Sequence, residues 1–307
     1  MAESRANASG SSESSARPPI LLASVFAVAM AGLVYELIAG TLSTYLLGGS
    51  VLVFSLVIGW FMFAMGAGAF LAKFVRSELE RAFVVAEVAL ALLGGTSALV
   101  LFSAFALSAP AYPVAVAVIC GVVGALVGIE IPLILRILEE RHSVRVAVSH
   151  VLALDYVGAL LGSIAFPLLL LPWLGVVRAS AMLGLMNLAV ALATLYAMRD
   201  RIGRPLSLYI SSGVTGVVLL GVLITGAGTT TFIEDRLYTD RVIHAESTSY
   251  QRIVVTKWRD DVRLYLEGHL QFSTSDEYRY HESLVLPVLA AARAPVRVLV
   301  LGGGDGL

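Results

Sequence analysis

Seven long apolar stretches limit what this chain can fold into. A helix needs about 20 mostly apolar residues to cross the hydrocarbon core of a bilayer. Segments that reach this length lie at residues 20–40, 51–72, 82–108, 111–135, 150–171, 179–198 and 207–227. Only 14% of all residues are charged, against about 25% in an ordinary soluble domain. The sequence therefore predicts an all-α, multi-spanning membrane bundle of about seven transmembrane helices over residues 20–227, with the lipid bilayer as its first partner.

The density of charge changes near Gly226. Residues 1–227 carry 23 charged side chains, whereas the 80 residues from 228 to 307 carry 20. The second proportion is that of a soluble domain. We therefore expect a water-facing part after the bundle. Residues 1–19, rich in Ser, Ala, Glu and Arg, are typical of a disordered tail.

Basic residues near the ends of the apolar stretches predict the orientation of the bundle. Eleven Lys or Arg residues lie in the tail and in the second, fourth and sixth connections, and only Arg178 lies in the others. Basic residues favour the cytoplasmic side, so we expect a multi-pass protein of the cell (plasma or inner) membrane with a cytoplasmic N-terminus. Seven crossings would then place residues 228–307 outside the cytoplasm. A broken segment around Pro167 and Pro172 would return them to the cytoplasm.

Four carboxylic acids fall inside the apolar stretches: Glu36, Glu87, Glu130 and Asp155. Such groups are costly in a bilayer and are functional candidates. We expect Glu87, Glu130 and Asp155 at one depth near the cytoplasmic ends of their helices, where they could bind a cation or protons in a transporter or sensor. Anchoring at the interface, or an ion pair such as Glu130 with Arg136, explains the same pattern. Both interpretations stay open.

Small residues recur at a spacing of four within the apolar stretches. These pairs are Ala64 and Gly68, Gly124 and Gly128, and Gly158 and Gly162. This spacing lets helices approach closely, so it predicts a bundle and leaves a homo-oligomer possible.

Composition also excludes several classes of protein. A net charge of −1 argues against binding to nucleic acid. The single cysteine, Cys120, excludes a disulfide scaffold and any site built from several thiolates. No metal site is expected.

The water-facing part is predicted to begin with β-strands. Alternating and β-branched patterns mark strands at 241–246, 250–258, 262–267 and 269–272, which predict a small antiparallel unit. A helix should follow, with Ser275 as its N-cap, so that this unit and its helix occupy residues 228–295. A buried strand at 296–301 then runs into Gly302-Gly-Gly-Asp-Gly306. This pattern is typical of the first strand and nucleoside loop of a Rossmann-like, methyltransferase-type α/β domain, whose loop glycines would be Gly302, Gly304 and Gly306.

Four motifs follow one another in order in the last 70 residues: Tyr250-Gln251, Leu266-Glu-Gly268 with Gln271, Asp276-Glu-x-x-Tyr280-His281-Glu282, and the glycine loop. The series resembles the spermidine synthase (polyamine aminopropyltransferase) family. Three motifs in the apolar part are similar to the family's membrane-bound branch, in which a bundle precedes the synthase domain: Tyr35-Glu36-Leu37, Glu130-x-Pro132-Leu133 and Asp155-Tyr-Val-Gly158.

This resemblance implies transfer of an aminopropyl group from decarboxylated S-adenosylmethionine, a co-substrate, to a small amine such as putrescine, with no permanently bound cofactor. It places Gln251 against the nucleoside, His281 at the amine, and Asp305 as a carboxylate that holds an amino group. Tyr280 and Gln271 are expected to line the same pocket. A methyltransferase is the nearest enzymatic alternative.

The sequence departs from the family in two places. Glu267 stands where the family usually has Asp, and the family's ribose-binding acid and general base would fall after Leu307. The chain is therefore expected to be truncated after its first glycine-rich motif, to contain no catalytic base, and to be inactive alone.

Overall fold

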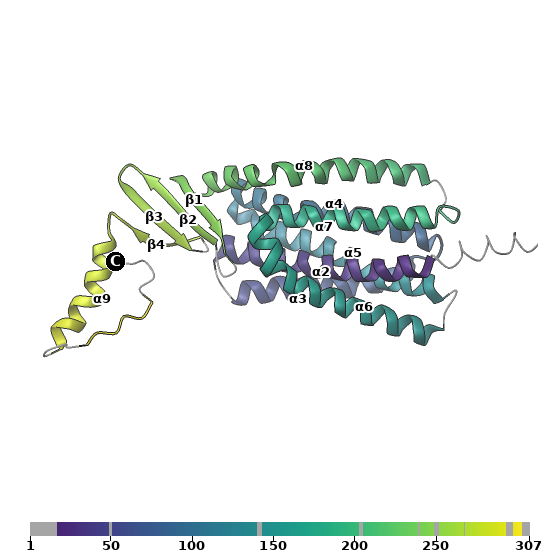
Figure 1. The fold of residues 1–307 in the computed structure, drawn as a ribbon, viewed down its shortest axis with the longest axis horizontal. Helices are drawn as coiled ribbons and strands as arrows, with labels where there is room; N and C mark the ends of the chain where they lie inside the picture. The colour runs from purple at the N-terminus through teal and green to yellow at the C-terminus, as the bar shows by residue number, and fades with distance from the viewer. Residues whose placement is uncertain are drawn as a thin grey trace, which may run out of the picture. The chain divides into compact units, whose positions relative to one another are not determined.

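The computed structural model describes residues 17–48, 51–139, 143–202, 205–238, 240–248, 252–266, 268–292 and 297–302. The chain divides into two compact units, residues 1–233 and residues 234–307. Figure 1 shows the helices of the first unit and the small sheet of the second.

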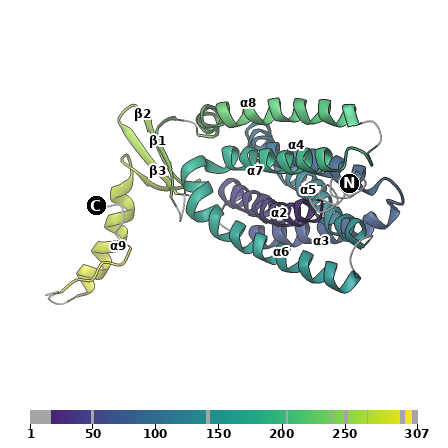
Figure 2. The same cartoon turned by 45° about the vertical axis from the view of Figure 1, so that its right-hand side comes forward.

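The first unit is a bundle of long helices, which lie roughly side by side in Figure 2. Its α-helices are α2 (Arg17–Leu47), α3 (Val51–Leu71), α4 (Leu79–Leu107), α5 (Tyr112–Glu139), α6 (Val144–Ala165), α7 (Leu171–Ala197) and α8 (Pro205–Leu237). Within the described residues, six continuous helical segments are long and apolar enough to cross a membrane, and one of them, Val144–Ala197, is 54 residues long.

That long segment contains the fifth and sixth predicted stretches. A π-helical turn, Phe166–Leu170, joins α6 to α7, and helical geometry continues past Pro167 and Pro172. It breaks at Gly175, whose φ of 69° and ψ of 171° are not helical. This backbone conformation suits glycine because it has no Cβ. A straight helix of 54 residues would be about 80 Å long, so the break is what lets α6 and α7 both fit within the bundle.

Glycines set the closest helix contacts, as the small-residue spacing predicts. A Cβ added at Gly124 would come within 2.8 Å of the Phe61 carbonyl oxygen, and one at Gly128 would overlap the Met65 carbonyl. Added Cβ atoms at Gly158 and Gly162 would likewise crowd the backbone of α2. The predicted close approach is therefore confirmed for α3 against α5 and for α2 against α6.

Large apolar side chains occupy the interior and also cover the outside. Tyr35, Phe61, Phe83 and Phe102 are at most 2% exposed. On α3, by contrast, the exposed large apolar side chains are Val51, Leu52, Leu56, Trp60, Met62, Phe63, Phe70 and Leu71. Soluble proteins seldom expose so large an apolar surface, so this face suits contact with lipid.

The second unit contains an antiparallel sheet and one helix. Strands β1 (Arg241–Ser247), β2 (Arg252–Trp258), β3 (Asp261–Leu266) and β4 (His269–Ser273) pair in sequence order. Helix α9 (Glu277–Ala291) follows and continues through Pro287. The predicted antiparallel unit is confirmed.

One prediction for this unit is wrong, and a second is unconfirmed. Asp276, not Ser275, precedes α9, and no side-chain bond caps the helix. The Ser275 side chain instead shares a 2.9 Å hydrogen bond with Ser273. The buried strand predicted at 296–301 is absent from residues 297–301, where Val298 is 69% exposed and Leu301 is 85% exposed. A lone strand has no partner for its backbone groups and no face to bury.

Candidate functional site

His281, which the resemblance places at the amine substrate, lies in the first turns of α9. Its Nδ1 is 2.9 Å from the Glu277 carbonyl oxygen and 3.0 Å from the Glu277 carboxylate. Both partners are acceptors, so Nδ1 carries the hydrogen and donates it. This contact fixes the tautomer and orientation of the ring whenever the imidazole is neutral.

Tyr280 and Gln271 both reach the surface of the second unit. The Tyr280 ring packs edge-on against His281, with 5.5 Å between ring centroids, and the residue is 65% exposed. Gln271 is the extra residue of a bulge in β4, because Leu270 pairs with Tyr265 while Phe272 pairs with Leu264. Bulges re-aim side chains and are common next to active sites.

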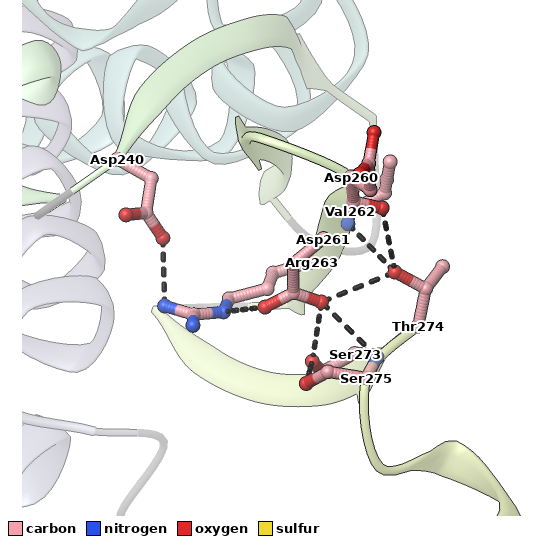
Figure 3. Close-up of polar contacts among 8 residues, drawn as sticks. All are labelled: Asp240, Asp260, Asp261, Val262, Arg263, Ser273, Thr274 and Ser275. Carbon is pink, nitrogen blue, oxygen red and sulfur yellow. Dashed lines mark hydrogen bonds and ion pairs between the residues drawn. The ribbon is translucent and has the colours of Figure 1, made fainter.

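A network centred on Asp261 fixes the turn that leads into α9 (Figure 3). The Asp261 carboxylate accepts hydrogen bonds from Arg263 Nε at 2.7 Å, Ser273 Oγ at 2.7 Å and the Ser275 backbone N–H at 3.2 Å. These bonds, that from Ser273 above all, hold the pKa of Asp261 below its usual value. The bond to Asp261 in turn raises the pKa of Arg263.

The same arginine connects the network to the segment before β1. Its Nη1 donates to Asp240 Oδ2 at 2.7 Å, so one guanidinium bridges two carboxylates, an arrangement that suits its planar fork of donors. The network therefore joins three parts of the unit and sets where α9, with Tyr280 and His281, begins.

The remaining predicted residues of this unit lie at or beyond the limits of the described chain. Gly302 is described, and its φ of 83° lies in the left-handed region that favours glycine. Gln251, Gly304, Asp305 and Gly306 lie outside the described residues.

The four carboxylic acids of the bundle occupy different surroundings. Glu87 on α4 and Glu130 on α5 are both 0% exposed. Glu36 is 7% exposed, and its charge acts on Cys120. Asp155 is half-buried on α6.

The structure does not show the ion pair considered between Glu130 and Arg136. The Arg136 Nη1 atom donates to the carbonyl oxygens of Ala72, at 3.2 Å, and Val75, at 2.6 Å, rather than to Glu130. Complete burial is also unlike anchoring at a wet interface.

Two further polar side chains lie near this pair: Tyr35, from the Tyr35-Glu36-Leu37 motif, and Asn187, which no motif marks. Asn187 on α7 donates from Nδ2 to the Tyr35 hydroxyl at 3.4 Å, and the charges of Glu87 and Glu130 both act on Tyr35. A lone asparagine in an apolar run was the available signal. Within the described part of the chain, no group of three or more His, Cys, Asp or Glu side chains could hold a metal ion.

The fold and these sites define a chain of two parts, an apolar helical bundle and a small sheet followed by a motif-bearing helix. Comparison with known proteins finds relatives whose sequences align with both parts. The chain is 47% identical over 294 residues to "Polyamine aminopropyltransferase 2" of Ralstonia nicotianae, covering 94% of this chain and 58% of that protein. It is 45% identical over 291 residues to the "Polyamine aminopropyltransferase" of Leptospira interrogans, covering 94% of this chain and 57% of that protein.

A third relative, the "Polyamine aminopropyltransferase" of Mycobacterium tuberculosis, is 40% identical over 299 residues, covering 94% of this chain and 57% of that protein. The chain thus spans a little under three fifths of the length of these curated relatives. No protein-family model and no solved structure matches it. Since the alignments include almost the whole chain, the bundle as well as the sheet is similar to proteins of this name.

Proposed function

We propose that the protein is a membrane-bound polyamine aminopropyltransferase, which transfers an aminopropyl group from decarboxylated S-adenosylmethionine to a small amine such as putrescine. The observation that carries this proposal is the identity of 40–47% to proteins of that name over 94% of the chain. The Tyr280-His281 motif at the start of α9 supports it.

Aminopropyl transfer depends more on how the two substrates are positioned than on a strong acid or base. The amine nitrogen forms a bond to the aminopropyl carbon, the carbon–sulfur bond breaks, methylthioadenosine leaves, and the new ammonium loses a proton. A sulfonium is a good leaving group, so the rate depends on holding the amine in line with that bond. His281, fixed through Nδ1 by Glu277, is placed to orient the amine, with Tyr280 lining the pocket beside it.

The second unit presents these groups on a rigid support. Four paired strands and the Asp261 network fix the turn before α9. Gln251 would contact the nucleoside and Asp305 would hold an amino group, as the resemblance implies.

The test joins residues 1–307 to the remaining part of the Ralstonia relative and measures methylthioadenosine formed from decarboxylated S-adenosylmethionine and putrescine. His281→Gln should lower kcat/KM by about 10- to 100-fold, as expected for losing a hydrogen bond to a charged group. His269→Gln is the matched control, since His269 is exposed on β4 and should leave kcat/KM unchanged. Equal activity of both variants would remove His281 from the amine site.

Transfer of a methyl group would contradict the proposed reaction itself. Donor labelled in the methyl group separates the two reactions, because an aminopropyltransferase leaves the label on methylthioadenosine and a methyltransferase moves it to the acceptor.

A further inference from the structure

The proposed reaction assigns no role to the polar groups buried inside the bundle. We name as the bundle cluster the side chains of Tyr35, Glu87, Glu130, Asn187 and Thr194, which come from α2, α4, α5 and α7. Tyr35 is 2% exposed and the other four are 0% exposed. Burial of this kind costs free energy unless each polar group is paired.

The register of the helices brings the cluster together. Helix α7 runs antiparallel to α4, because Gly184 approaches Ala91 and Gly95 while Arg201 pairs with Glu80 at 3.1 Å. Between these two fixed points, Glu87 lies level with the part of α7 that runs from Asn187 to Thr194. Those two residues are seven apart, so they share one face of the helix.

Tyr35 reaches the same interior from α2. Its ring lies over Gly94 of α4, where an added Cβ would come within 2.6 Å, and its hydroxyl accepts the hydrogen bond from Asn187. The charges of Glu87 and Glu130 both act on it.

Several acceptors of the cluster have no partner among the described residues. Both carboxylate oxygens of Glu87, both of Glu130, Asn187 Oδ1 and Thr194 Oγ1 make no hydrogen bond there. Two buried carboxyl groups can be ionised together only where a cation compensates their charge. The unpartnered carboxylate oxygens therefore call for a ligand that brings both positive charge and hydrogen-bond donors.

We propose that the bundle cluster binds the primary ammonium group of a small organic amine. An ammonium brings one positive charge and three N–H donors, which the unpartnered oxygens of Glu87 and Glu130 can accept. A divalent metal fits less well, because the described part of the cluster offers two acidic ligands and no third acid, His or Cys. This inference is independent of the proposed function, since it concerns the bundle and not α9.

Calorimetric titration of the full chain in lipid nanodiscs tests the proposal. Methylammonium and putrescine should bind, whereas tetramethylammonium, which has the same charge as methylammonium but no N–H donor, should not. Glu87→Gln, Glu130→Gln and Asn187→Leu should each weaken binding by about tenfold or more. Glu36→Gln is the matched control, because Glu36 is also buried in α2 but is not part of the bundle cluster.

A second measurement needs no variant and so does not depend on the variants folding. A hydrophobic carbodiimide should label Glu87 or Glu130 in the wild-type chain, and methylammonium should protect them where sodium does not. Peptide mass spectrometry locates the label. Absence of methylammonium binding, equal protection by sodium, equal binding of tetramethylammonium, or unchanged binding in folded Glu87→Gln and Glu130→Gln variants would each overturn the proposal.

Discussion

Asp261 illustrates how one side chain can fix the course of the chain around a site that it does not enter. It is the first residue of β3, yet its carboxylate reaches the turn between β4 and α9, where it accepts bonds from Ser273 and from the Ser275 backbone. Its neighbour Asp260 contributes only a backbone carbonyl, 3.3 Å from the Thr274 hydroxyl. The two aspartates therefore form a matched pair for mutation.

Asp261→Asn should loosen the turn before α9. The substituted amide would remove the charge and would place an NH2 group against the Arg263 donor, which now bonds the carboxylate at 2.7 Å. We expect faster amide hydrogen exchange at Ser275, measured by mass spectrometry on peptides that cover 270–280. Asp260→Asn should leave that exchange unchanged, and equal effects of the two substitutions would contradict the network as described.

The lowered pKa of Asp261 also predicts a dependence on pH. A carboxyl group whose pKa is lower in the folded state stabilises that state above its unfolded pKa, about 3.9, and loses the effect as pH falls through the folded value. The protection of Ser275, corrected for intrinsic exchange rates, should therefore exceed that of Asp261→Asn at pH 6, and the two should converge at low pH. A difference that grew on acidification would have the wrong sign.

Sequence patterns identified single residues only where the residue belongs to a motif or where its burial in a membrane would cost free energy. The intramembrane acids Glu87 and Glu130 stand out because charge is rare in an apolar stretch. Asn187 does not, and although Tyr35 stands in a motif, the hydrogen bond between Asn187 and Tyr35 depends on how the helices are rotated about their axes, which no local pattern contains. The prediction of Ser275 as an N-cap is wrong, because Ser275 forms hydrogen bonds with Ser273 and Asp261, which lie outside the helix.

At the scale of elements, the contact between α3 and α5 depends on Gly68. A Cβ there would overlap the Ala125 carbonyl of α5, whereas a Cβ at Gly66, two residues earlier on α3, would meet nothing within 4 Å. Gly68→Ala should destabilise the bundle by about 1–3 kcal/mol through overpacking. Gly66→Ala should leave stability unchanged or raise it by up to about 1 kcal/mol through helix propensity. Thermal unfolding of the full chain in detergent provides the comparison, and equal melting temperatures would contradict the close contact.

Helices and strands could be predicted where a sequence pattern repeats over many residues. They were harder to predict where an element forms only beside a neighbouring element. The apolar stretches and alternating strands match α2 to α8 and β1 to β4, because length and periodicity are local properties. The end of α6 and the start of α7 were harder, since Pro167 and Pro172 suggested a break that falls instead at Gly175. Residues 297–301 have the composition of a buried strand, but a strand forms only beside another.

At the scale of the whole molecule, the orientation of the bundle can be tested with reporters active only outside the cytoplasm. Eleven basic residues against one predict a cytoplasmic N-terminus. With seven crossings, reporters fused after Gly48 and after Arg236 should both be active, and one after Arg76 should be silent. A silent reporter after Arg236 beside an active one after Gly48 would require an even number of crossings and return the second unit to the cytoplasm, where the nucleoside donor is made.

We propose that one chain combines a membrane bundle with the beginning of an aminopropyltransferase site. The most direct measurement is the formation of methylthioadenosine by washed membranes of cells that express residues 1–307 joined to the rest of the Ralstonia relative. Given decarboxylated S-adenosylmethionine and putrescine, the washed membranes should form product and the soluble fraction should not. The proposal would be contradicted if product formed only in the soluble fraction. It would also be contradicted if neither fraction formed product with any common di- or triamine.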